Sequence, residues 1–95
     1  MTADSSPRSR TLNIVNKRGL HARASARFVH TVEGFDATVR VTREGSTVGG
    51  TSIMGLMMLA ASPGCSILVQ AEGVQADQVL DALEALIADR FGEEA

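Results

Sequence analysis

Apolar residues recur at helical spacing in residues 22–33 and fall on one side of the predicted helix. The stripe is formed by Ala24, Phe28, Val29 and Val32, while Arg27 and His30 fall on the opposite side. Because a helix on the surface of a globular protein buries one such stripe, this pattern predicts an amphipathic helix. Gly34 follows at the position where a left-handed residue would end the helix.

Two further segments are predicted to be helical. The last of them has the clearest stripe, formed by Ala76, Val79, Leu80, Leu83, Leu86 and Ile87. Asp77 favours the start of this helix, and Arg90 and Gly92 favour its end. A shorter helix is predicted over residues 53–61, where residues 63–64, a Pro-Gly pair, stop it.

Four segments are typical of β-strands. Residues 37–43 alternate between apolar and polar side chains, which predicts a strand with one buried face. Residues 44–45, a Glu-Gly pair, then predict a turn, so residues 46–48 are expected to form the second strand of a hairpin. Apolar runs in residues 11–16 and 66–72 predict two more strands.

The predicted order of elements is β-α-β-β-α-β-α. This order and the short connections predict an α+β fold, an open-faced sandwich in which a four-stranded antiparallel sheet carries three helices on one face. A chain of 95 residues is long enough for one modest core. We expect residues 11–95 to form this single domain and residues 1–10, rich in Ser and Arg, to form a disordered tail.

Composition and charge exclude several classes of protein. The formal net charge is −2 and the nine basic residues are scattered, which argues against a nucleic-acid binder. No apolar run approaches the roughly 20 residues that cross a bilayer, and the polar N-terminal residues lack the apolar centre of a signal peptide. The single cysteine, Cys65, cannot form an internal disulfide. We therefore expect a soluble cytoplasmic protein that needs no metal or cofactor.

Residues 19–23, Gly-Leu-His-Ala-Arg, join a predicted strand to a predicted helix. The first backbone N–H groups of a helix have no intrahelical acceptor, and with the helix dipole they favour an anion by up to about 2 kcal/mol. His21 is a nucleophile that can change charge near neutral pH, and Arg23 can bind phosphate through two parallel hydrogen bonds. The sequence therefore predicts that His21 accepts a phosphoryl group and that Arg23 stabilises it.

Residues 19–23 and the Ser-Ala-Arg-Phe-Val run at 25–29 resemble the active-site segment of HPr, the histidine-containing phosphocarrier family of the bacterial phosphotransferase system. Residues 52–57 resemble the regulatory-serine segment of that family, and the resemblance covers about residues 11–91. It implies that His21 takes a phosphoryl group from phosphorylated enzyme I and passes it to a downstream acceptor of the enzyme IIA type in sugar transport. Such a chain is a stoichiometric phosphocarrier, not an enzyme in the strict sense.

One position departs from the family's pattern. The family usually has proline directly after the arginine, whereas this chain has Ala24. Proline presets φ for the first helical turn and lacks an N–H, so alanine adds one donor and loosens the turn. We expect a small change in stability and in affinity for the phosphoryl group, with the role retained. Arg27, one turn further, is expected either to present a second positive charge to a partner or simply to be solvated.

The second motif begins the short helix. Ser52 is the expected N-cap, whose hydroxyl accepts a hydrogen bond from the first turn. The resemblance implies that an HPr serine kinase modifies this serine in some members, which would place negative charge beside a docking surface. The helix is apolar on nearly every side, so part of it must stay exposed. We expect Ile53 and Met57, one turn apart, to form a partner-docking patch.

Two other functions are compatible with the same residues. A regulatory docking module of this fold, such as a nitrogen-type phosphotransferase chain, would control other proteins by its phosphorylation state and would not serve sugar uptake. A small hydrolase similar to acylphosphatase would share the compact α+β plan and an anion-binding loop. The hydrolase would need a residue that positions water, and none stands out near His21.

Overall fold

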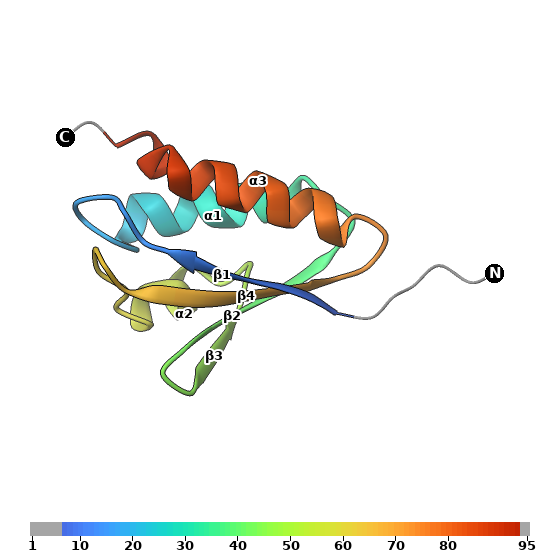
Figure 1. The fold of residues 1–95 in the computed structure, drawn as a ribbon, viewed down its shortest axis with the longest axis horizontal. Coiled ribbons are helices and arrows are strands. Elements are labelled where there is room, and N and C mark those ends of the chain that lie inside the picture. Colours follow the sequence, from blue (N-terminus) through green and yellow to red (C-terminus); the bar gives the residue numbers. More distant parts are fainter. Residues whose placement is uncertain (1–6, 94–95) are drawn as a thin grey trace.

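One antiparallel sheet carries the fold, with its four strands in the order β1-β4-β2-β3 (Figure 1). The computed structural model describes residues 7–93. The strands are β1 (Arg8–Asn13), β2 (Thr38–Arg43), β3 (Ser46–Gly49) and β4 (Ser66–Glu72). Because β1, at one edge of the sheet, pairs with β4 despite their separation in sequence, the sheet ties the first strand to the last.

The helices are α1 (Ala22–Glu33), α2 (Ile53–Met58) and α3 (Ala76–Ala88), followed by a short 3-10 turn, η1 (Arg90–Gly92). Helices α1 and α3 lie side by side over one face of the sheet, and α2 contacts α1 and β3 (Figure 1). The predicted α+β open-faced sandwich and the order of its elements are thus confirmed.

The core lies between the helices and the sheet. Its largest fully buried side chains are Phe28, Ile14, Leu56, Ile67, Leu80, Leu83, Val41, Val69 and Val79. The predicted apolar stripes of α1 and α3 supply most of the helical part of this core, and the alternation of β2 supplies Val39 and Val41. At about 25 cal/mol per Å² of apolar surface removed from water, this burial is the main favourable contribution to folding.

The first strand begins earlier than the sequence predicts. It was expected over residues 11–16, with residues 8–10 in a disordered tail, but β1 begins at Arg8, which pairs with Ala71 of β4. Arg10 forms ion pairs across the sheet edge with two carboxylates of α3, Asp81 and Glu84. The strand therefore depends on pairing and on long-range charge contacts, neither of which leaves an apolar pattern. Residues 1–6 of the predicted tail lie outside the described residues.

Two predictions about helix ends were also wrong: the conformation of the residue that caps α1, and the last residue of α2. Gly34 has φ −80° and ψ −1°, a right-handed conformation. Its N–H donates to the carbonyl of Thr31 and that of Phe35 donates to the carbonyl of Val32, so the helix ends in a tightened turn and not a left-handed cap. Helix α2 ends at Met58 and not at residue 61. Ala60 has φ 53°, which turns the chain back before the Pro-Gly pair is reached.

Candidate functional site

The loop between β1 and α1 is held against the segment that follows α2. Gly19 has φ 64°, and the N–H of Leu20 donates to the carbonyl oxygen of Ala61 at 2.9 Å. Leu20 is buried. Because this loop is fixed on both sides by backbone contacts and a buried side chain, the residue after it enters α1 in a defined direction.

His21 is the N-cap of α1. Its backbone is extended, with φ −74° and ψ −180°, and its carbonyl oxygen accepts from the N–H of Ser25 at 2.8 Å. The imidazole makes no capping hydrogen bond, so the first amides of the helix are left to other acceptors. The structure therefore places the histidine at the helix N-terminus, as the sequence predicts.

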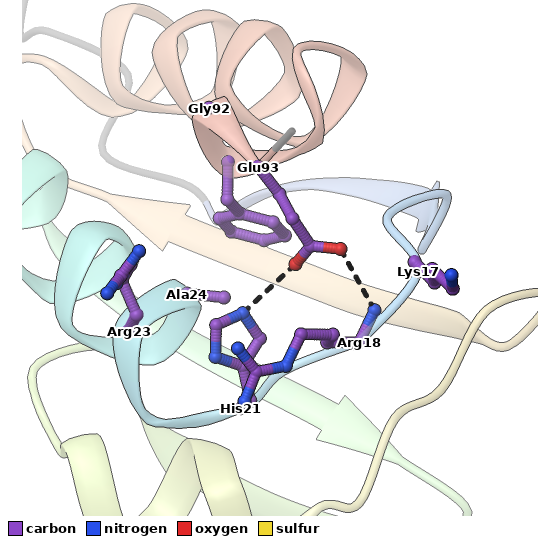
Figure 2. Close-up of a pocket in the computed structure, with 8 residues that line it drawn as sticks. Lys17, Arg18, His21, Arg23, Ala24, Gly92 and Glu93 are labelled. Atoms are coloured by element: carbon purple, nitrogen blue, oxygen red, sulfur yellow. Dashed lines mark hydrogen bonds and ion pairs between the residues drawn. The ribbon is translucent and has the colours of Figure 1, made fainter. Parts of the chain in front are cut away.

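The carboxylate of Glu93 lies against the imidazole. Its Oε2 is 3.1 Å from Nε2 of His21, and its Oε1 accepts from the N–H of Arg18 at 3.1 Å (Figure 2). The side chains of His21 and Glu93 are only 17% and 14% exposed. The histidine is thus largely covered, because the C-terminal segment folds over one edge of its ring.

An open cleft of about 590 Å³ surrounds this pair. It is lined by Lys17, Arg18, His21, Arg23, Ala24, Phe91, Gly92 and Glu93 (Figure 2). Three residues with cationic side chains therefore line the cleft together with one carboxylate, in a chain whose net charge is −2. The positive charges of these three residues outweigh the negative charge of the carboxylate, so the cleft can attract an anion.

Arg23 shares the cleft with His21, as the sequence predicts. Its side chain is exposed and forms no ion pair with any group in residues 7–93. A guanidinium in this state keeps all its donors for a ligand. Ala24, which occupies the family's proline position, is fully buried at the wall of the same cleft.

The turn that brings Glu93 to the site was not predicted. Arg90, Phe91 and Gly92 have φ values of 57°, 55° and 71°, so three consecutive residues are left-handed. Phe91 is buried and anchors this turn. Non-glycine residues adopt this conformation at a cost of about 1–2 kcal/mol each, which tertiary contacts must offset. An isolated phenylalanine after the helix was the one sequence signal that could have indicated an anchor.

Hydrogen bonds keep Glu93 ionised. The side-chain N–H of Asn16 donates to Oε2 at 3.1 Å, and Asn16 itself is fully buried. This bond, followed by those from the Arg18 amide and from His21, lowers the pKa of the Glu93 carboxyl. The site residues that sequence reasoning missed are therefore Asn16, Lys17, Arg18 and Glu93.

Arg27 lies beside η1. A Cβ atom built on Gly92 would lie 2.6 Å from its Nη1, so the guanidinium covers the C-terminal turn and is otherwise exposed. Arg27 does not line the cleft around His21. Its exposed place beside η1 is compatible with both interpretations that the sequence allowed, a contact with a partner and simple solvation.

Ser52 is the N-cap of α2, as predicted, and its hydroxyl accepts from the N–H of Gly55 at 2.9 Å. It does not line the cleft. The predicted apolar patch is exposed, with Ile53 at 40% and Met57 at 38%. Met54 and Met58 are more exposed still, which extends the apolar surface of α2 beyond the predicted pair.

Comparison with known proteins identifies the family. Residues 8–89 match the family model of the PTS HPr component phosphorylation site. The chain belongs to the HPr family. The phosphocarrier protein HPr of Cupriavidus necator is 46% identical over 84 residues, which cover 88% of this chain and 94% of that protein.

Relatives with two different names are similar to this chain in sequence. The phosphocarrier protein NPr of Shewanella violacea is 36% identical over 84 residues, covering 88% of this chain and 92% of that protein. The crystal structure of HPr-C-His from Thermoanaerobacter tengcongensis has a TM-score of 0.87 at 40% identity, over 93% of this chain and 99% of that one. The match to the HPr family model ends at residue 89, so Glu93 lies beyond it.

Two further observations concern residues 7–93 only. No helix there is long and apolar enough to cross a membrane. In the same part of the chain, no group of three or more His, Cys, Asp or Glu side chains is arranged to hold a metal ion.

Proposed function

We propose that this HPr-family protein carries a phosphoryl group on His21 in the cytoplasm. It receives the group from phosphorylated enzyme I and passes it to a downstream acceptor of the enzyme IIA type. The observation that carries this proposal is the position of His21, at the N-terminus of α1 in a cleft with three cationic side chains. A phosphoryl group brings about two negative charges, which this cleft can stabilise without a catalytic base.

The transfer requires only substitution at phosphorus. A ring nitrogen of His21 donates its lone pair to phosphorus while the bond between phosphorus and the donor protein breaks, and the electron pair of that bond stays with the donor. Onward transfer reverses the roles, since the P–N bond on His21 breaks as the acceptor's nucleophile bonds to phosphorus. The open cleft allows a partner to reach the group, and Arg23 stabilises and aligns its charge.

The proposal is tested by labelling with enzyme I and labelled phosphoenolpyruvate. The expected product is a phosphoprotein that loses its label in acid, because phosphohistidine is hydrolysed in acid. His21→Ala should abolish the label, and His30→Ala, which changes the exposed histidine of α1, should retain it. Labelling of the His21→Ala variant would overturn the assignment. Steady release of phosphate from a small acyl phosphate, without any partner protein, would indicate a hydrolase.

A second function in the same family is a regulatory docking module of the nitrogen type. The specific support is the similarity to the phosphocarrier protein NPr of Shewanella violacea. Such a chain would control other proteins by its phosphorylation state and would not serve sugar uptake. The two functions separate when the labelled protein is offered in turn to sugar-type and nitrogen-type enzyme IIA proteins, because the physiological acceptor discharges the label faster.

The surface of α2 is the proposed partner-docking site, together with Arg27 beside η1. Ile53 and Met57 are exposed apolar side chains on a helix that contacts α1, which carries His21 at its start. Ser52, at the N-terminus of α2, is the proposed target of an HPr serine kinase. A phosphate there would add negative charge at the edge of the docking surface and weaken binding of an acidic partner.

A further inference from the structure

Glu93 is fixed by three hydrogen-bond donors of the segment that precedes α1. Oε2 lies 3.1 Å from both Nε2 of His21 and Nδ2 of Asn16, and Oε1 accepts from the N–H of Arg18 at 3.1 Å. The Nδ2 of Asn16 also donates to the carbonyl oxygen of Gly19 at 2.8 Å. Because both partners of the Asn16 side-chain amide are acceptors, its Nδ2 must face them and not its Oδ1. The carboxylate of Glu93 is therefore held in one place.

An ionised carboxylate can only accept hydrogen bonds. The contact with His21 therefore requires a proton on Nε2. In a neutral imidazole the other nitrogen, Nδ1, then keeps its lone pair, and it is the nitrogen turned away from Glu93 (Figure 2). Because Nε2 of His21 must donate in this contact, Nδ1 is the ring nitrogen that is free to act as the nucleophile.

We propose that Glu93 is a positioning residue for phosphoryl transfer, holding the proton of His21 on Nε2 so that the lone pair of Nδ1 faces the incoming group. This inference rests on the proposed function of His21. As the Nδ1–P bond forms and the bond from phosphorus to the donor breaks, the proton stays on Nε2. The electron pair of the broken bond leaves with the donor, so the step needs no other reactant.

The contact becomes stronger as the reaction proceeds. With Nδ1 bonded to phosphorus and Nε2 still protonated, the ring of His21 carries a formal positive charge. Its hydrogen bond to Glu93, until then from a neutral donor to a carboxylate, becomes an ion pair, and the attraction between the two opposite charges adds to the bond. An interaction that is stronger at the transition state than at the start raises the rate. We expect Glu93 to contribute about five- to tenfold to the transfer rate.

The repulsion between Glu93 and the phosphoryl group is offset within the same cleft. The carboxylate contacts Nε2, so the imidazole ring separates it from a group on Nδ1. Lys17, Arg18 and Arg23 line the cleft as well. The three cations leave the cleft positive even with Glu93 ionised, so the carboxylate can orient the ring without excluding an anion.

The C-terminal turn is built to deliver this carboxylate. The left-handed conformations of Arg90 and Phe91 are unfavourable, and burial of the Phe91 ring offsets their cost. A straight continuation of α3 would carry Glu93 past the end of the domain and not back to His21. The turn and Glu93 both lie beyond the part of the chain that matches the family model.

The proton on Nε2 is observable by NMR of the full chain with ¹⁵N-labelled histidine. In the native protein we expect a ring Nε2–H signal from His21, protected from exchange with water by its hydrogen bond. Glu93→Ala should abolish this signal, while Glu33→Ala, which changes an exposed glutamate at the end of α1, should leave it unchanged. The exposed His30 provides an internal reference for unprotected rings. A protected His21 signal that survives in Glu93→Ala would overturn the proposal.

The rate of labelling by the same phosphoryl donor gives the second readout. Glu93→Ala should slow labelling about five- to tenfold, and Glu33→Ala should not. If His21→Ala abolishes labelling but Glu93→Ala changes neither the ring proton nor the rate, the positioning role is wrong and the proposed function stands. If the native protein is not labelled at all, the proposed function fails, whatever the ring proton shows. An amide spectrum unchanged outside residues 16–21 and 88–93, the segments that Glu93 contacts or belongs to, establishes that Glu93→Ala is folded.

Discussion

The N–H of Leu20 donates to the carbonyl oxygen of Ala61 at 2.9 Å, which holds the loop before His21 against the end of α2. Gly19, the residue before Leu20, has φ 64°, and a Cβ atom built on it would overlap the carbonyl oxygen of Ala61. The direction in which the chain enters α1 therefore depends on the absence of a side chain at residue 19.

Gly19→Ala is expected to destabilise the fold by about 3 kcal/mol, since the strained backbone and the overlap with Ala61 both add to the cost. Gly45→Ala is the matched control, because Gly45 also has a positive φ of 83° but nothing lies within 4 Å of its built Cβ. That variant should lose only about 1 kcal/mol. Urea unfolding of both variants measures the difference, and equal losses would show that the contact with Ala61 does not matter.

Arg23→Gln should separate function from stability. The Arg23 side chain is exposed and has no ion pair among residues 7–93, so its replacement should change the free energy of unfolding by less than about 0.5 kcal/mol. Loss of charged hydrogen bonds to the phosphoryl group should slow labelling of His21 by about tenfold or more. Arg40→Gln, at an exposed position of β2, should affect neither quantity. An unchanged labelling rate in Arg23→Gln would exclude a role for this guanidinium.

The part of the site at the start of α1 could be predicted from the sequence, whereas the part that the C-terminal segment contributes could not. His21 and Arg23 lie within one strand-to-helix junction, where helix periodicity and the free amides of the first turn define their surroundings. Glu93 meets His21 across 72 positions of sequence, and no periodicity connects them. The approach of Glu93 depends on the left-handed turn at Phe91. Steric clashes make this conformation rare for a bulky residue, so the sequence gives no reason to expect it there.

The same distinction explains the errors in the fold. The bounds of α1 follow from its own apolar stripe and were predicted well. Residues 8–10 have no buried face, and they form a strand because β4 offers a partner and α3 offers carboxylates for Arg10. Helix α2 ends early because Ala60 turns left-handed, which brings Ala61 to Leu20. In each case a tertiary contact decided the outcome over the local propensity.

Ser52→Ala should remove both a helix cap and a modification site. Loss of the bond from the N–H of Gly55 should cost about 1 kcal/mol in the free energy of unfolding. Thr51→Ala, at the exposed neighbouring residue, should cost less. With an HPr serine kinase, the native protein and Thr51→Ala should acquire an acid-stable label that Ser52→Ala lacks. An acid-stable label on Ser52→Ala would refute the assignment of Ser52.

Ala24→Pro restores the family's residue and should stabilise the fold by about 0.4–1 kcal/mol. Ala24 is the third residue of α1, so its N–H has no intrahelical acceptor and proline removes no helical hydrogen bond. Ala26→Pro, two residues further into the helix, removes such a bond and should destabilise by about 3 kcal/mol. Thermal unfolding compares the two. A loss of stability in Ala24→Pro would show that the cleft wall has no room for the ring.

The carboxyl of Glu93 should give the fold an acid-sensitive contribution. Its pKa is lowered chiefly by the hydrogen bond from Asn16, and next by that from the Arg18 amide. A group whose pKa is lower in the folded than in the unfolded protein stabilises the fold fully above its usual pKa of about 4.5, and this stabilisation is lost as the pH falls through the folded value. Protonated Glu93 then resembles glutamine.

The contribution is isolated by urea unfolding of His21→Ala and of the double variant His21→Ala/Glu93→Gln at a series of pH values. Removal of the imidazole leaves Glu93 as the titrating group of the contact, since Lys17 and Arg18 stay charged throughout. Above about pH 5, His21→Ala should be more stable than the double variant. The Glu93 carboxylate accepts from two donors, the Asn16 side chain and the Arg18 amide, whereas glutamine must place its own N–H groups against one of them. The difference should close as the pH falls below about 4.5. A difference that stays constant across this range would mean that the carboxylate's hydrogen bonds do not contribute to the fold.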